Sequence, residues 1–440
     1  MLAVVVSRAD EASEHIGEQL LDIAEWDELE DGRRSDADGG GRYYRTEGIE
    51  LRTFDDLHLN LDGVAAAFDE PDLLVFASRH AGDTGPLLTA HATGNFGPAE
   101  YGGRAGSLAR AAPNALSVVR AELETHAPTG YDAGIECTHH GPSTVGCPSL
   151  FVEIGSEKAQ WRDPEAAAAV AHAILGLVGV SAHRERAVVG FGPRHYAPRF
   201  DRILTETDWG VGHIASDWAL EAMDTPDDSR AVIAKAFRMS GTEFAVLEGT
   251  HPELESVIEE LGFEILSETF LRETTGVPLG LVGRLEDTLC PVADGLRFGT
   301  AAADTETFRT MELPTELLAE ANGLDRKAVI EVLTRTAVAY GTTEGATMAA
   351  GPVALPEAGS YREIVEGLAG VLESKYDTVE LRESAVVASR TAFDPDLATE
   401  RGVEPGPMFG RLSDGEAVEV DGTRIDPTEV RSVRERQFPF

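Results

Sequence analysis

Short apolar runs alternate with helix-like runs through the first 268 residues, and this alternation constrains the fold more than any other feature. Residues 2–7 (LAVVVS) and 71–78 (PDLLVFAS) have the length and composition of buried strands. Residues 164–179 (PEAAAAVAHAILGLVG) have the alanine-rich pattern and early proline of a helix. Strands that alternate with helices form sheets covered by helices. We therefore expect an α/β fold, a three-layer α/β/α sandwich with a mixed sheet.

The character of the sequence changes after about residue 280. We expect a domain that carries the chemistry over 1–280, a mostly helical extension over 281–395 and a small β module over 396–440, since 440 residues suggest two to three domains. Within the module, the Asp-Gly pair of VEVDGTRI (418–425) predicts a β-hairpin. The start, MLAVVVS, lacks the basic region of a signal peptide, and no run of about 20 apolar residues predicts a membrane span. We expect a cytoplasmic protein.

The net charge is −40, yet lysine is almost absent. Of the 37 basic residues only four are lysines, namely Lys158, Lys235, Lys327 and Lys375. Acid spread over a whole chain with so little lysine is typical of a halophilic archaeon, where molar salt screens charge repulsion over about 3 Å. The charge therefore reports the environment, and it does not exclude RNA as a partner.

Several common sites are unsupported by the sequence. The three cysteines, Cys137, Cys147 and Cys290, form no CxxC pair and leave one unpaired in any disulfide scheme, so we expect reduced thiols. The chain has no GxGxxG or GxxxxGK[ST] phosphate loop, no HExxH zinc helix and no GxSxG nucleophile elbow. Nucleotide-phosphate cradles of these types and a serine hydrolase of the elbow type are therefore not predicted.

The heptapeptide ECTHHGP (136–142) places two adjacent histidines after an apolar strand. In a continuing strand, His139 and His140 would point to opposite faces. Three further histidines, His80, His91 and His195, also follow apolar strands. Strand ends converge at the edge of a parallel or mixed sheet, so all five are expected to meet at one rim: His80, His91, His139, His140 and His195. One shared functional site is the prediction.

Such a rim allows two chemistries. Imidazoles beside Glu136, Glu153 or Asp83 suit one or two zinc ions, which would lower the pKa of a bound water. The same histidines alternatively serve as general acids or bases, because their pKa lies near working pH. The residues alone leave both alternatives open.

Four separated segments resemble one family, the archaeal and plant type of D-aminoacyl-tRNA deacylase. They are FASRHAGDTGPLLTAHATGNFG, ECTHHGP, LFVEIGS and GPRHYAPRF, in this order. The resemblance covers roughly residues 1–275. It implies hydrolysis of the ester between a D-amino acid and tRNA, a zinc requirement, and a sandwich fold similar to the phosphorylase and peptidyl-tRNA hydrolase group. The remainder exceeds the family's usual length. Its end resembles a segment of archaeal tRNA 3′-processing endonucleases but lacks their HxHxDH motif, so we expect an accessory extension.

The matching positions give the candidate site residues. The candidate catalytic residues are His139, His140, Glu136 and His80. The candidate substrate-binding residues are Ser78, Arg79, Asn95, Arg194 and Tyr196. The candidate zinc ligands, which are our own inference from the rim, are His91, His139, His195 and Glu153. The expected partner is D-aminoacyl-tRNA, without a membrane, and a monomer is favoured.

Two other functions use the same features. A zinc exopeptidase or amidohydrolase of similar sandwich fold would share the histidine rim but act on peptides. A non-catalytic tRNA-binding protein would need basic patches and no histidine rim. Activity on D-tyrosyl-tRNA, with and without a chelator, separates the three.

Overall fold

In the computed structural model, which describes residues 1–357 and 361–440, the chain divides into two units, Met1–Thr275 and Gly276–Phe440. Residues 358–360, which belong to the expected helical extension, lie outside the described residues. No helix of the described residues is long and apolar enough to cross a membrane.

An eight-stranded mixed sheet organises the first unit, in the order β2-β3-β4-β1-β5-β10-β6-β9. Its strands are β1 (Leu2–Ser7), β2 (Asp27–Asp31), β3 (Gly41–Thr46), β4 (Ile49–Phe54), β5 (Leu73–Arg79), β6 (Leu87–His91), β9 (Asp132–Ile135) and β10 (Ser149–Gly155). The central strands β4, β1, β5 and β10 are parallel, and β6 pairs antiparallel with β10. The strand β9 follows β6 in parallel. The expected mixed α/β architecture is thus confirmed.

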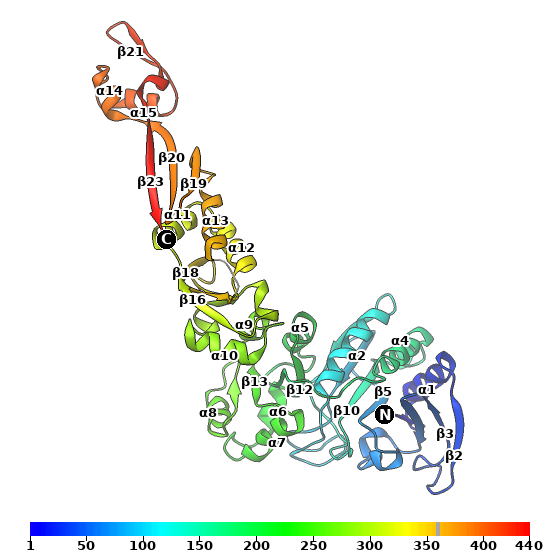
Figure 1. Cartoon of the computed structure of the whole chain (residues 1–440). Coiled ribbons are helices and arrows are strands. Elements are labelled where there is room, and N and C mark those ends of the chain that lie inside the picture. The colour runs from blue at the N-terminus through cyan, green and yellow to red at the C-terminus, as the bar shows by residue number, and fades with distance from the viewer. Residues whose placement is uncertain (358–360) are drawn as a thin grey trace. The chain divides into compact units, whose positions relative to one another are not determined.

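Helices cover one face of this sheet. They are α1 (Glu11–Ile23), α2 (Pro113–His126), the short α3 (Lys158–Trp161) and α4 (Pro164–Leu175). The helices α1 and α2 both pack against α4, and α1, α2 and α4 lie on β5, β6 and β10, respectively (Figure 1). On the other face, Phe76 and Phe151 stack with ring centroids 4.5 Å apart and join a core with Val64 and Phe68 from the segment after η1 (His58–Asn60).

A second sheet of four parallel strands follows in the same unit, in the order β12-β11-β13-β14. Its strands are β11 (Ala187–Phe191), β12 (Gly210–Ala215), β13 (Phe244–Leu247) and β14 (Glu264–Ile265), and its helices are α5 (Pro198–Glu206), α6 (Asp217–Ala222), α7 (Arg230–Ser240), α8 (Pro252–Glu260) and α9 (Glu268–Glu273). The alternation after residue 186 therefore builds its own sheet. The segment after β9 leaves the large sheet, and Cys137 N donates to His195 O (2.9 Å) while Thr138 N donates to Ile214 O (3.0 Å).

The second unit contains more strand than we expected. Its helices α10 (Leu279–Thr288), α11 (Thr315–Leu324), α12 (Arg326–Thr336) and α13 (Tyr361–Leu372) accompany an antiparallel sheet in the order β15-β17-β18-β16. These strands are β15 (Leu296–Phe298), β16 (Phe308–Glu312), β17 (Ala339–Thr343) and β18 (Met348–Pro356). The mostly helical description of 281–395 is corrected by the hairpin β17–β18. The turn of this hairpin contains Glu344 and Gly345 at φ 50° and 65°, in the left-handed region, so a right-handed helix cannot run through it.

The boundary expected at residue 396 also cuts through a sheet. The strands β19 (Thr378–Leu381), β20 (Ala385–Phe393) and β23 (Arg431–Pro439) form the order β19-β20-β23, with β20 and β23 antiparallel throughout. The residues between them form α14 (Pro395–Glu400), α15 (Pro407–Ser413) and the hairpin of β21 (Val418–Val420) and β22 (Thr423–Ile425) (Figure 1). The hairpin prediction is confirmed, with Asp421 and Gly422 at φ 47° and 79°.

Candidate active site

The segment ECTHHGP continues β9 without being a strand, and this explains the direction of its histidines. Glu136 N still donates to Ala90 O of β6 (3.2 Å), but Gly94 N and Thr93 Oγ1 both donate to His140 O, at 2.7 and 2.9 Å. The alternation of a strand is therefore interrupted. As a result the rings of His139 and His140 lie together, with centroids 4.4 Å apart, and the expected opposite directions are wrong.

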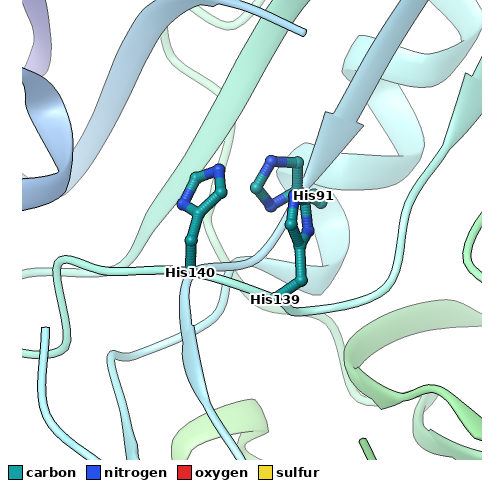
Figure 2. Close-up of side chains that lie close together, drawn as sticks. All are labelled: His91, His139 and His140. Carbon is teal, nitrogen blue, oxygen red and sulfur yellow. The ribbon is translucent and has the colours of Figure 1, made fainter. Parts of the chain in front are cut away.

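Three imidazoles gather at this point, from His91 at the end of β6 and from His139 and His140 (Figure 2). Ring centroids of His91 lie 4.5 Å from His139 and 4.8 Å from His140. Each Nδ1 donates to a nearby backbone carbonyl, so that each Nε2 keeps its lone pair: His91 to Ala92 O (3.0 Å), His139 to Cys137 O (2.8 Å) and His140 to Gly141 O (2.8 Å). The backbone thus fixes the tautomer in which a histidine binds metal through Nε2.

The electrostatics of His139 and His140 favour this use, whereas those of His91 favour its protonated form in the absence of a cation. Burial lowers the pKa of His139 to about 3 and holds the pKa of His140 well below its usual range. Burial also opposes the charged form of His91, but Glu153 outweighs it and raises that pKa. The Nε2 of His91 lies 3.6 Å from Glu153 Oε1, beyond hydrogen-bond distance, and has no hydrogen-bond partner among the described residues. A cation bound at this nitrogen would satisfy it.

Glu136 holds a second group of imidazoles. His195 Nε2 donates to Glu136 Oε2 at 2.7 Å, and His80 Nδ1 lies 3.2 Å from Oε1. Burial alone would raise the pKa of Glu136, but the hydrogen bond from His195 and the close imidazole of His80 hold it well below its usual range. The carboxylate is therefore ionised although its side chain is fully buried.

Glu153 completes the site from β10. Its Oε2 lies 3.8 Å from His80 Nδ1, and burial raises the pKa of Glu153 despite the neighbouring His91. Burial opposes the charged form of His80, yet Glu136 outweighs it and raises the pKa of His80. On its other side, His80 Nε2 lies 3.2 Å from the hydroxyl of Tyr196. Within the described residues, groups of at least three metal-binding side chains with ligand atoms within 4.8 Å occur only here.

Comparisons with known proteins show the family of this chain. The sequence model of a family described as D-aminoacyl-tRNA deacylase matches residues 67–266. A D-aminoacyl-tRNA deacylase of Natronomonas pharaonis is 67% identical over 441 aligned residues, which cover 100% of both chains. One from Haloarcula marismortui is 47% identical and also covers 100% of both. This chain belongs to the D-aminoacyl-tRNA deacylase family. A crystal structure described as a conserved protein of unknown function is similar with a TM-score of 0.56 and 28% identity, over 62% of this chain and 98% of that one.

The strand directions in this deacylase differ from the simple rim that we expected. Because β6 runs antiparallel to β10, His91 lies opposite Phe151 in the middle of β10 and not beside the end of β5 that carries His80. The rings of His91 and Phe151 are parallel, with centroids 5.2 Å apart. The site therefore lies on the face of the sheet opposite α1, α2 and α4, and the predicted residues meet across that face.

A pocket of about 420 Å³ opens onto the site of the deacylase. Seven of the predicted residues line it: Ser78, Arg79, His80, His139, His140, Glu153 and His195. Glu136 and His91 are buried next to these residues. Three predicted substrate-binding residues are not in its wall. Asn95 uses its amide to hold Gly102 O (2.9 Å), Tyr196 contacts His80, and Arg194 is exposed with no side-chain ion pair in the described ranges.

Sequence reasoning missed six residues of the pocket wall, namely Asp10, Leu57, His58, Leu59, Ala81 and Tyr101. Asp10 caps α1 through Ala12 N (3.0 Å), and its other oxygen accepts from Arg79 N (3.0 Å). The sequence changes from a strand pattern to a helix pattern at Asp10, which indicates a helix cap there. Nothing in that pattern indicates the contact between Asp10 and Arg79. Burial lowers the pKa of His58 to about 4. Nothing in the sequence places His58 or Tyr101 near the other histidines.

Proposed function

We propose that this protein hydrolyses the ester bond of D-aminoacyl-tRNA and releases tRNA and the free D-amino acid. Membership of the family and the composition of the pocket support the proposal. The observation that carries it is the convergence of three Nε2 lone pairs beside a buried, ionised carboxylate that holds two further imidazoles. An aminoacyl ester is already activated, so a positioned water and stabilisation of the developing oxyanion suffice for its hydrolysis.

The cluster of His91, His139 and His140 suits a zinc ion. All three offer Nε2, two are held neutral by burial, and the Nε2 of His91 is a buried polar atom without a partner among the described residues. Three protein ligands and one open position are typical of catalytic zinc sites. When bound, zinc would supply a lowered pKa for water and polarise the ester carbonyl. This set replaces His195 and Glu153, which we expected as ligands, with His140.

The protein's own groups would move the proton. Glu136 orients His195 by the 2.7 Å hydrogen bond, as the acid of a catalytic triad orients its imidazole. The His195 side chain is 28% exposed and lines the pocket. We propose that His195 takes a proton from the attacking water while the water oxygen adds to the carbonyl carbon of the ester. The same proton then passes to the ribose oxygen as the ester bond breaks. His80, in contact with Glu136 and Tyr196, is the second candidate for this role.

The remaining roles follow from position. Ser78 and Arg79 line the pocket beside His80, and the Arg79 guanidinium lies 5.2 Å above the ring of Trp161. We propose that they contact the aminoacyl group and that exposed Arg194 contacts a phosphate. Rejection of the L-substrate would come from a clash with the pocket wall. We further propose that the fold is a three-layer sandwich similar to that of peptidyl-tRNA hydrolase. We also propose that the protein is a monomer in the cytoplasm and contains zinc.

The test is hydrolysis of D-tyrosyl-tRNA and L-tyrosyl-tRNA by the purified full chain in molar potassium chloride, with and without a chelator. We expect rapid release of D-tyrosine, little release of L-tyrosine, loss of activity with the chelator and recovery with added zinc. Equal rates on both substrates would overturn the proposal. Full activity in protein shown by elemental analysis to be metal-free would overturn the zinc assignment alone. Hydrolysis of dipeptides in place of the ester would favour the amidohydrolase alternative.

A further inference from the structure

The wall of the histidine pocket contains one residue whose exposure the proposed chemistry does not explain. Tyr101 is 63% exposed, and it lines the same pocket as His80, His139 and His195. Large hydrophobic side chains are rarely so exposed in the described residues, and the others do not line this pocket: Leu29, Val178, Trp218 and Val433. An aromatic ring is therefore present at the mouth of the site, with its surface open to solvent.

The backbone of Tyr101 is fixed although its side chain is exposed. It belongs to the loop between β7 (Gly94–Asn95) and β8 (Ser107–Leu108). Gly141 N, in the segment that carries His139 and His140, donates to Tyr101 O at 3.1 Å. The buried amide of Asn95 donates to Gly102 O at 2.9 Å. Hydrogen bonds to the carbonyls of Tyr101 and of the next residue thus fix the loop, and the first of them ties it to the segment that carries the histidines.

Two glycines allow this close packing. Gly102 and Gly103 both have φ +74°, a conformation that favours glycine. A Cβ on Gly102 would collide with the carbonyl of Leu59, and a Cβ on Gly103 would collide with Ser143 Oγ. The loop backbone is therefore packed closely against its neighbours, whereas the side chain of Tyr101 remains largely exposed.

We propose that Tyr101 is a stacking platform for the base of the 3′-terminal nucleotide of tRNA. The inference rests on the proposed function and names a binding site within it. The aminoacyl ester and the terminal base are attached to the same ribose. When the ester carbonyl reaches the histidines inside the pocket, the base lies at the pocket mouth, where Tyr101 is.

The charge of the protein favours stacking as the source of affinity. A chain with net charge −40 gains little from long-range attraction to phosphates, and molar salt removes most of the counterion-release contribution. Stacking of a base on an aromatic ring contributes about 1–3 kcal/mol and depends on the π-face, not on charge. A ring held rigidly at the pocket mouth would supply this contribution at any salt concentration.

Steady-state kinetics with D-tyrosyl-tRNA provide the first test. We expect Tyr101→Ala to raise KM about tenfold and to change kcat less than about twofold, the signature of lost stacking. Tyr101→Phe and Tyr101→Trp should retain the wild-type KM. Trp218→Ala, which removes an exposed aromatic of the same unit outside the pocket, is the matched control and should change nothing. An unchanged KM in folded Tyr101→Ala overturns the proposal.

Minimal substrates separate the base from the aminoacyl group. Wild-type enzyme should prefer the D-tyrosyl ester of adenosine over D-tyrosine ethyl ester, which has no base, and Tyr101→Ala should lose only this preference. An equal loss on both esters would mean that Tyr101 contacts the amino acid, and would overturn the proposal. Adenosine monophosphate binding, measured by calorimetry, tests the platform even if hydrolysis fails. Its affinity should fall about tenfold in Tyr101→Ala.

Discussion

Two pockets of the same size, about 420 Å³ each, differ completely in chemistry. The pocket of the first unit contains His80, His139, His140 and His195 together with Glu153. The pocket of the second unit is lined mainly by small and apolar residues, with Asn322 and Arg326 among its few polar groups. All twelve histidines of the chain lie in Met1–Thr275, and Gly276–Phe440 has none.

The difference shows that volume alone does not identify a reactive site. In the second unit, Asn322 Nδ2 donates to Ala349 O (3.0 Å), and only its Oδ1 is left without a partner among the described residues. In the first unit, several ionisable groups shift one another's pKa, and a buried imidazole nitrogen has no partner among the described residues. Clustered groups of this kind mark functional sites more reliably than cavities do.

Removal of the histidine cluster should give the largest effect. We expect His139→Ala and His140→Ala each to reduce kcat/KM for D-tyrosyl-tRNA by about 10²-fold or more, because each loses a proposed zinc ligand or acid-base group. Bound zinc, measured by elemental analysis, should fall in both. Asn322→Ala in the other pocket is the control and should leave kcat/KM unchanged. Near-wild-type rates in both folded histidine variants would remove the distinction between the pockets.

Loss of the Glu136 charge should give a smaller effect. Glu136→Gln keeps the size of the side chain but no longer orients His195 and His80 as an anion, and we expect kcat to fall about 10- to 100-fold. The KM should change little, since Glu136 is buried next to the pocket wall and not part of it. A change confined to KM would contradict the assigned role in proton transfer. Thermal unfolding of the variant checks that it is folded.

A fall in pH from 7 toward 4 should lower the free energy of unfolding of the first unit more than that of the second unit. Burial lowers the pKa of His58 and of His213 to about 4, below the value near 6.5 of an unfolded chain. Below pH 6.5 the unfolded state therefore binds more protons. Each histidine contributes stability that is complete above pH 6.5 and is lost, by up to about 3 kcal/mol, as the pH falls toward 4. The second unit has no histidine to respond in this way.

The tryptophans allow the units to be followed separately. All four, Trp26, Trp161, Trp209 and Trp218, lie in the first unit, whereas circular dichroism reports both. Between pH 7 and pH 5, at constant salt, the fluorescence transition should move to lower temperature by more than the transition that circular dichroism follows, because the dichroism signal averages both units. His213→Gln should reduce this shift. Parallel shifts of both signals would argue against the buried histidines as the cause.

Salt should give the smallest effect. If binding depends on short contacts in the pocket of the first unit, the KM for D-tyrosyl-tRNA should change little between about 1 and 3 M potassium chloride. A steep rise in KM over this range would locate the affinity in charged surfaces, including the arginines of β20 and β23. The measurement requires circular dichroism at each salt concentration as a check of folding.

Much of the fold was visible in the sequence because periodicity reports local structure. The runs that became β1, β5 and α4, and the Asp-Gly turn between β21 and β22, each contain their own signal. The direction of a strand and the choice of its neighbours leave no such signal in the local sequence. The antiparallel pairing of β6 with β10, the separate sheet from β11 to β14 and the pairing of β20 with β23 are set by long-range contacts.

The candidate site was visible only as a set of residue types. Five histidines were predicted to share one site because they follow apolar strands in the sequence. In the structure they lie close together. Their grouping followed from hydrogen bonds that no pattern reveals: the carbonyls that hold Nδ1 of His91, His139 and His140, and the bond between His195 and Glu136. Asn95 instead holds the carbonyl of Gly102, and Arg194, next to His195 in sequence, is exposed and not part of the pocket wall.

The ladder between β6 and β10 has a consequence for how this family can diverge. His91 and Glu153 are fixed relative to each other by paired strands, with Phe151 opposite His91 and Glu153 opposite Thr89. Insertions in the connections around them leave this spacing untouched. The segments that carry Leu59 and Tyr101 at the pocket wall can thus change in length while the distance between His91 and Glu153 stays the same.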